Sequence, residues 1–188
     1  MYKFTKFDKA NMQMAYITAN LSYCQRRQVG AVIVRDDRVI ANGVNGTSKG
    51  TENICEDSYI NCTCCNEKIY LTKDVLNVAD EKGRMLTNCS CGASHIYFTN
   101  DDIKLTTNDK VIHAEQNAII FAARNGIRID GTTMFVTTEP CIDCAKFIEA
   151  SGIKKVIYRE FYKSNAGIEY LQNNGVKCYR YDVLDLEK

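Results

Sequence analysis

The residue types best suited to chemistry form two short motifs in the second half of the chain. His113-Ala-Glu115 precedes a run of helix-forming residues, and Pro140-Cys141-Ile-Asp-Cys144 precedes another. One imidazole and two thiolates supply three protein ligands to zinc and leave the fourth tetrahedral position for water, an arrangement typical of catalytic zinc. The sequence therefore predicts a catalytic zinc site built from His113, Cys141 and Cys144.

Both motifs lie where helices are expected to begin. The positive end of a helix dipole and its free amides favour thiolates over thiols, and therefore favour metal binding. Pro140 suits the position before such a helix, because the N–H that proline lacks would have no helical partner there.

Glu115 lies two residues after His113, too near to be a further ligand without strain but able to reach a water molecule in the open position. A carboxylate there can take a proton from that water and deliver it to a departing amine, as hydrolytic deamination of a cytosine or adenine base requires. H-x-E followed by P-C-x-x-C is the signature of zinc deaminases. The alternatives are a redox dithiol or a closed structural zinc site with a fourth cysteine, and the closed site leaves Glu115 without a role.

Composition narrows the class of protein. The 188 residues include 24 Lys plus Arg and 23 Asp plus Glu, a net charge of +1, which does not favour binding to a nucleic-acid backbone. An N-terminal signal and an apolar run long enough to span a membrane are both lacking, so we expect a cytoplasmic protein, in the host cytoplasm if it is phage-encoded. In a reducing compartment, metal ligation accounts for the ten cysteines better than disulfides do.

Strands that alternate with helices must position the two motifs. A hairpin is expected where Asp36 and Asp37 separate two apolar runs. The pattern predicts an α/β layered domain whose sheet is at least partly parallel. Expected helices cover 8–22, 114–125, 141–151 and 166–174, and expected strands cover 30–34, 39–44, 133–138, 156–158 and 176–181.

A polar stretch from 46 to 110 interrupts this pattern and holds six of the ten cysteines. A structureless loop of that length is improbable inside a compact domain, whereas a metal could cross-link it. We interpret it as an insertion with a strand or helix within 67–80 and a strand at 95–98.

Two close cysteine clusters in this insertion, Cys62-Thr-Cys-Cys65 and Cys89-Ser-Cys91, could form a closed tetrahedral site. The sequence thus predicts a second, structural zinc, with Cys62, Cys65, Cys89 and Cys91 as candidate ligands. More donors are present than one ion needs, including His95, and buried or free thiols are the alternative. Cys178 stands alone on a C-terminal strand and has no assigned role.

The sequence around these motifs resembles that of the deoxycytidylate (dCMP) deaminase family, of the phage type with an extra zinc site, within the cytidine deaminase-like superfamily. The resemblance is carried by IHAEQNAIIFAARNG at 112–126, TTEPCIDCAKFIEASGIKKVIY at 137–158, VGAVIV at 29–34 and NGVNGT at 42–47. It implies a three-layer α/β/α cytidine deaminase-like fold with a mixed sheet, formed by one domain over 1–188 with the Cys-rich insertion at 46–110. It also implies zinc-dependent hydrolysis of dCMP to dUMP and ammonia, which supplies dUMP for thymidylate synthesis.

The same resemblance suggests substrate contacts. Asn45 would hydrogen-bond the sugar and Tyr162 would lie at the pocket rim, although Asn-Gly is a common turn and a tyrosine can simply cover a strand end. The family often has a Ser/Thr-Lys pair before VGAV, where this chain has Arg26 and Arg27. Either arginine could bind the 5′-phosphate or be an ordinary solvated residue.

Relatives further imply a homohexamer regulated by dCTP and dTTP, with Mg²⁺ accompanying a triphosphate effector. Arg124 is a candidate effector contact or an ordinary surface residue. Several relatives carry an extra zinc that uses cysteines at positions matching Cys24 and Cys55. The competing hypotheses are deamination of dCTP, deamination of a base in tRNA or single-stranded DNA, and a zinc-ribbon interaction module with a decayed deaminase core.

Overall fold

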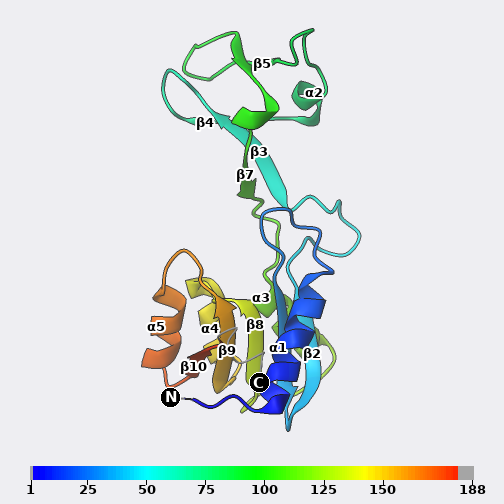
Figure 1. The fold of residues 1–188 in the computed structure, drawn as a ribbon, viewed down its shortest axis with the longest axis vertical. Helices are drawn as coiled ribbons and strands as arrows, with labels where there is room; N and C mark the ends of the chain where they lie inside the picture. Colours follow the sequence, from blue (N-terminus) through cyan, green and yellow to red (C-terminus); the bar gives the residue numbers. More distant parts are fainter. Residues whose placement is uncertain (1, 182–188) are drawn as a thin grey trace. The chain divides into compact units, whose positions relative to one another are not determined.

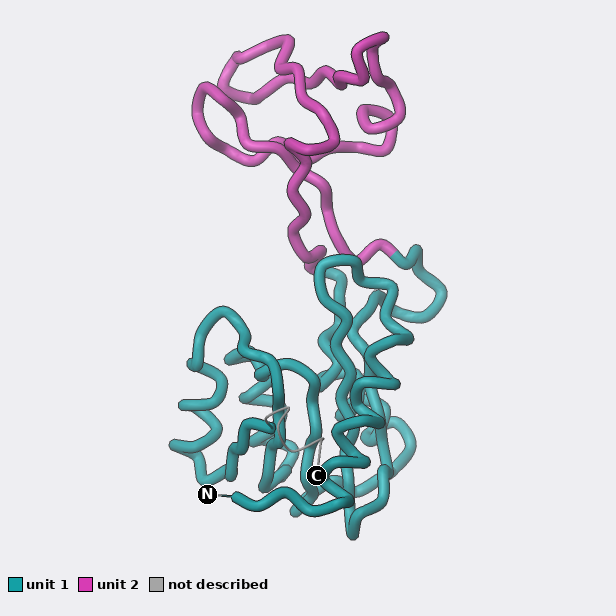
Figure 2. Tube along the Cα trace, in the orientation of Figure 1, with its two compact units in different colours: residues 1–53, 110–188 teal, residues 54–109 magenta. Residues whose placement is uncertain are grey.

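The structure is a computed structural model that describes residues 2–181, so the expected domain range of 1–188 extends beyond it at both ends. The chain forms two compact units (Figure 2). Unit 1 contains the chain up to Asn53 and again from Lys110 onward, and unit 2 spans Ile54–Asp109. The sequence prediction placed the insertion at 46–110, so its expected start lies eight residues before the start of unit 2 at Ile54.

Unit 1 is organised around a five-stranded sheet with the strand order β10-β9-β8-β1-β2 (Figure 1). Strands β8, β9 and β10 are parallel, whereas β1 is antiparallel to both β8 and β2. Asp36 and Asp37 both have positive φ angles in the turn between β1 and β2, as a tight hairpin requires. The strands are β1 (Gly30–Arg35), β2 (Arg38–Val44), β8 (Thr133–Thr138), β9 (Lys155–Glu160) and β10 (Lys177–Arg180).

Alternating side chains of the sheet form two separate cores. In β1, Ala31 and Ile33 belong to the core packed by three helices, whereas Val32 and Val34 belong to the core packed by one helix. This confirms the predicted three-layer α/β/α fold with a mixed sheet. The three helices on one face are α3 (Ala114–Arg124), α4 (Ile142–Ala150) and α5 (Ala166–Asn173), and the helix on the other face is α1 (Lys6–Ala19).

The start of α1 differs from the sequence prediction, which began this helix at Asp8. Thr5 is the N-cap, because its hydroxyl accepts the Asp8 N–H at 3.1 Å and the Asp8 carboxylate accepts the Thr5 N–H at 2.8 Å. This capping box satisfies two free donors of the first turn, so the helix begins at Lys6, two residues earlier than expected. None of the helices in the described part of the chain has the length and apolar character needed to cross a membrane.

Unit 2 contains more strands than the sequence pattern indicated. The expected element within 67–80 becomes a short strand followed by one helical turn, and the expected strand at 95–98 appears as β6. Strands β3 and β7 were not predicted, because their polar residues do not alternate with apolar ones. The elements are β3 (Glu56–Asn61), β4 (Lys68–Tyr70), α2 (Lys73–Leu76), β5 (Met85–Thr87), β6 (Ile96–Phe98), the 3-10 turn η1 (Asn100–Asp102) and β7 (Lys104–Thr107).

The strands of unit 2 form two small sheets, β4-β3-β7 and β5-β6. Their core is limited to five buried residues, Ile60, Cys62, Met85, Ile96 and Phe98, with several half-buried side chains around them. A core of this size gives little hydrophobic stabilisation on its own.

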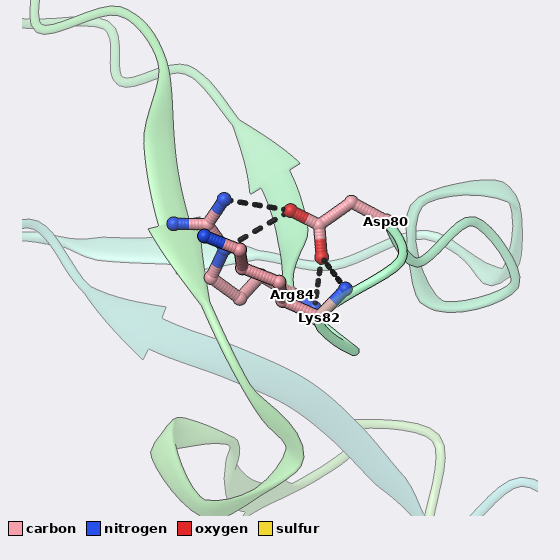
Figure 3. Close-up of polar contacts among 3 residues, drawn as sticks. All are labelled: Asp80, Lys82 and Arg84. Atoms are coloured by element: carbon pink, nitrogen blue, oxygen red, sulfur yellow. Dashed lines mark hydrogen bonds and ion pairs between the residues drawn. The ribbon is translucent and has the colours of Figure 1, made fainter.

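The turn before β5 is held by one carboxylate. Asp80 accepts the backbone N–H groups of Lys82 at 2.9 Å and Arg84 at 2.8 Å, and its other oxygen accepts the Arg84 guanidinium (Figure 3). These donors, above all those of Arg84, lower the pKa of Asp80. The turn is thus ordered by local polar contacts.

Candidate active site

Two helix starts bring the first group of predicted ligands together in unit 1. His113 is the N-cap of α3 and Cys141 is the N-cap of α4, which follows the carboxyl end of β8. His113 Nδ1 lies 3.2 Å from Cys144 Sγ and 3.6 Å from Cys141 Sγ. All three donor atoms lie within 4.8 Å of one another.

These donors fit zinc. Tetrahedral Zn–S and Zn–N bonds place neighbouring ligand atoms about 3.5–3.8 Å apart, close to the observed spacings. The Cys144 thiol and His113 lower the pKa of Cys141 to about 4, whereas the neighbouring Cys141 sulfur and burial raise the pKa of Cys144. The Cys141 sulfur therefore favours the thiolate form, which is the form that binds a metal ion.

Glu115 lies in the first turn of α3 beside this group. Its side chain is 4% exposed, and burial raises its pKa to about 7. Such a carboxyl group exchanges protons readily near neutral pH, which suits a general acid and base.

The first turn of α3 is anchored to β2 and to the segment after it. Gly43 packs against this turn without a side chain between them, and the Asn117 side chain donates to the Val44 carbonyl at 2.9 Å. Gly46 and Ile112 exchange two backbone hydrogen bonds immediately before His113. The helix start that carries His113 and Glu115 is therefore fixed by the strand beside it.

The Asn45 side chain holds the loop that precedes β1. Its Oδ1 accepts the Val29 N–H at 2.8 Å, and its Nδ2 donates to the Arg27 carbonyl at 2.9 Å. The contacts present are structural, and the predicted sugar contact stays a prediction.

The Arg27 side chain reaches the segment that contains Tyr162. Its guanidinium donates to the Phe161 carbonyl at 3.2 Å and lies 5.7 Å from the centre of the Tyr162 ring. The structure thus groups Asn45, Arg27 and Tyr162, which the sequence suggested separately. Arg124 is exposed at the far end of α3, about 16 Å along the helix from His113.

The sequence analysis did not identify Glu139, a carboxylate beside this group. Glu139, which directly precedes Pro140, is 3% exposed, and its carboxylate accepts the Tyr162 N–H at 3.1 Å. An acidic residue between a buried strand and the Pro-Cys motif was the available signal. The Glu139 side chain links the Tyr162 segment to the loop that carries Cys141.

The second predicted ligand group lies in unit 2. Cys62 Sγ is 3.8 Å from Cys91 Sγ, Cys65 Sγ is 3.6 Å from Cys89 Sγ, and all four sulfurs lie within 4.8 Å of one another. The backbone N–H groups of Cys65 and Cys64 lower the pKa of Cys62 to about 6. These four positions are the ones that the sequence spacing suggested.

The other candidate donors lie outside both groups. The Cys64 side chain is exposed, and the ring of His95 contacts Ser94. Cys24 Sγ donates to the Asn45 carbonyl at 3.7 Å, and Cys55 is buried but belongs to neither cluster. Burial raises the pKa of Cys178 to about 12, and its thiol donates to the Val176 carbonyl.

The amino-acid sequence is similar to that of known zinc-binding deaminases. The family model of the cytidine and deoxycytidylate deaminase zinc-binding region matches residues 5–160. The deoxycytidylate deaminase of Enterobacteria phage T4 is 34% identical over 183 residues, which cover 94% of this chain and 91% of the relative. The corresponding protein of phage T2 is 36% identical over 182 residues, covering 94% of this chain and 93% of the relative.

A solved structure is also similar over most of the chain. The dCMP deaminase of cyanophage S-TIM5, in complex with dCMP and dUMP, is 29% identical with a TM-score of 0.65, and the match covers 96% of this chain and 100% of that one. Together with the relatives and the family match, this shows that the chain belongs to the cytidine and deoxycytidylate deaminase family.

Proposed function

We propose that this protein is a deaminase that hydrolyses dCMP to dUMP and ammonia, with dUMP passing to thymidylate synthesis. The observation that carries the proposal is the buried Glu115 carboxyl beside the three convergent ligand atoms of His113, Cys141 and Cys144. The T4 and T2 relatives are named deoxycytidylate deaminases, and the S-TIM5 structure contains the substrate and product of that reaction.

His113, Cys141 and Cys144 would hold the catalytic zinc. When bound there, zinc supplies Lewis-acid activation of water for attack on the base. The Gln116 side chain accepts the His113 backbone N–H at 3.1 Å and so helps to fix the start of α3.

Glu115 carries the protons of the reaction. Oxygen from water bonds to C4 of cytosine, the bond from C4 to the amino nitrogen breaks, and ammonia leaves. The two protons of the water are relayed by the Glu115 carboxylate, one to N3 of the ring and one to the departing amine. The buried position of Glu115 keeps bulk water from competing for these transfers.

We propose that Asn45, Arg27 and Tyr162 bind the substrate. Asn45 keeps one amide hydrogen and one lone pair beyond its loop contacts, which suffices for a sugar hydroxyl. The guanidinium of Arg27 suits the 5′-phosphate, and Tyr162 would lie at the rim of the pocket.

A substrate panel tests the proposal. Ammonia release would be measured with deoxycytidine, dCMP, dCTP, a single-stranded oligodeoxynucleotide and an adenosine-containing tRNA anticodon loop. We expect dCMP to have the highest kcat/KM. Preference for dCTP or a nucleic-acid base would replace the proposal with the corresponding alternative, and no turnover of any substrate would reject it.

We also infer that unit 2 holds a second, structural zinc through Cys62, Cys65, Cys89 and Cys91. Four thiolates close the coordination sphere, so this ion would stabilise the fold without an open position for water. The small core of unit 2 supports this role, since metal binding then contributes much of its folding free energy. Unit 2 is in this view an insertion within one deaminase domain. Zinc counted per chain, with the variants described in the Discussion, tests the assignment.

Assembly and regulation complete the proposal. Exposed apolar side chains on the helices of unit 1, including Met14, Ile17, Phe121 and Phe147, support a homo-oligomer, and we propose a hexamer. Light scattering would test the oligomeric state.

We further propose that dCTP and dTTP regulate the enzyme through a site that includes Arg124, with Mg²⁺ on the triphosphate. Rates measured with each effector, in the native protein and in Arg124→Gln, would test that site.

A further inference from the structure

A concave region lies at the opposite end of the unit 1 sheet from the group formed by His113, Cys141 and Cys144. It has a volume of about 500 Å³ and sits at the amino ends of β8, β9 and β10, whereas Cys141 follows the carboxyl end of β8. Its lining includes Lys154, Lys155 and Lys177 together with Tyr2 and Tyr179. We call it the lysine pocket.

Two adjacent strands bring the three lysines together, with Lys154 one residue before the start of β9. Lys177 pairs with Lys155 across β10 and β9, and the Lys177 N–H donates to the Lys154 carbonyl at 3.0 Å. Within residues 2–181, no carboxylate forms an ion pair with any of the three. Asp130, next to the lining residue Gly131, is already paired with Arg128 at 2.9 Å. The pocket therefore gathers positive charge that the described part of the chain does not neutralise.

Two tyrosines give this pocket a fixed wall. The Tyr2 and Tyr179 rings stack with their centres 4.1 Å apart, and Lys155 Nζ donates to the Tyr2 hydroxyl at 3.1 Å. The lining residues Gly131 and Gly175 have positive φ angles and open space where a Cβ would project. Their backbone thus stays accessible at the rim, and Lys155 is held in place before any ligand arrives.

We propose that the lysine pocket binds the polyphosphate chain of a small molecule. Successive phosphates offer several anionic oxygens spaced along a chain, so they can meet three separated ammonium groups better than one phosphate can. The volume lies in the range of small-ligand sites. The net charge of +1 and the confinement of the lysines to one hollow disfavour a nucleic-acid strand, which needs an extended basic surface. This inference does not rest on the proposed deaminase activity.

Calorimetric titration of the full-length, zinc-loaded protein tests the site. The titrants are inorganic tripolyphosphate, inorganic phosphate, dCTP and a short single-stranded oligonucleotide. We expect tripolyphosphate to bind more tightly than phosphate and the oligonucleotide. The dCTP titration uses Arg124→Gln, which removes the proposed effector contact outside the pocket. Comparable binding of dCTP and tripolyphosphate in that variant would indicate a nucleotide ligand, whereas weaker binding of dCTP would indicate free polyphosphate, and both agree with a polyphosphate site.

Variants at the two exposed lysines locate the binding. Lys154→Gln and Lys177→Gln should each weaken tripolyphosphate binding about tenfold, as expected for loss of one charged hydrogen-bond donor. The double variant Lys154→Arg/Lys177→Arg should retain binding. The matched control Lys49→Gln, at an exposed lysine outside the pocket, should bind tripolyphosphate as the native protein does.

Deamination of dCMP without added polyphosphate should be unchanged in the Lys154 and Lys177 variants, which separates this site from the catalytic one. Absence of tripolyphosphate binding would overturn the proposal. Equal binding by the native protein and by both Gln variants would also overturn it, as would binding of the oligonucleotide alone.

Discussion

Gly43 on β2 packs directly against Ala118 on α3, and a Cβ added to Gly43 would overlap the Ala118 backbone. The same close approach extends to Ala114, which lies between His113 and Glu115. The absence of one side chain on a strand thus sets the position of the helix start that carries two of the proposed active-site residues.

Substitution of Gly43 by alanine should therefore destabilise unit 1. Forcing a methyl group into this contact should lower the free energy of unfolding by about 1–3 kcal/mol, the usual cost of overpacking. Chemical denaturation would measure the loss. Gly46→Ala is the matched control, because nothing lies within 4 Å of a Cβ built there. If both variants unfold alike, the close contact does not limit the packing of α3.

Glu115→Gln should abolish dCMP turnover while zinc at the catalytic site is retained. The amide keeps the size of the carboxyl group but cannot accept and return a proton, so kcat should fall at least about 10²-fold. Steady-state kinetics and metal analysis on the same sample would measure both effects. Glu169→Gln, on an exposed position of α5, is the control. A fully active Glu115→Gln variant would contradict the proton-relay mechanism.

The two cysteine groups should lose zinc independently. Cys144→Ser removes a ligand from the first group, so we expect one fewer zinc per chain and no dCMP turnover. Cys65→Ser should also lose one zinc, but from unit 2. Cys178→Ser should retain the native zinc content because its thiol contacts the Val176 carbonyl. Native zinc content in Cys65→Ser would argue against the second site.

Chelation of the second zinc should unfold unit 2. Its core is small, so we expect that an excess of a strong chelator will expose new protease cleavage sites within residues 54–109. Mass spectrometry of the fragments would locate the cuts, and added zinc should suppress them. Cleavage that is unchanged by chelation would show that unit 2 folds without metal.

Glu139→Gln should weaken substrate binding more than it slows the chemical step. The Glu139 carboxylate accepts the Tyr162 N–H, and a neutral amide accepts it less strongly, so the Tyr162 segment should loosen. We expect the KM for dCMP to rise several-fold, up to about tenfold, with a smaller change in kcat. Glu169→Gln serves again as the control. An equal fall in kcat and kcat/KM would place Glu139 in the chemistry instead.

Local sequence determined much of unit 1. The strand at Thr133–Thr138 and the helices that follow His113 and Cys141 were predicted within one or two residues, because apolar periodicity and cap residues act over a few neighbouring positions. The convergence of the first group of candidate ligands follows for the same reason, since His113 and the Cys141–Cys144 pair each begin a helix.

Tertiary structure decided what local patterns could not. The polar strands β3 and β7 exist because they pair with each other across more than forty residues of intervening chain, and neither shows this in its own sequence. Long-range pairing likewise joins Glu139 to Tyr162 and gathers the three lysines of the lysine pocket, since such contacts depend on strand order and register rather than on neighbouring residues.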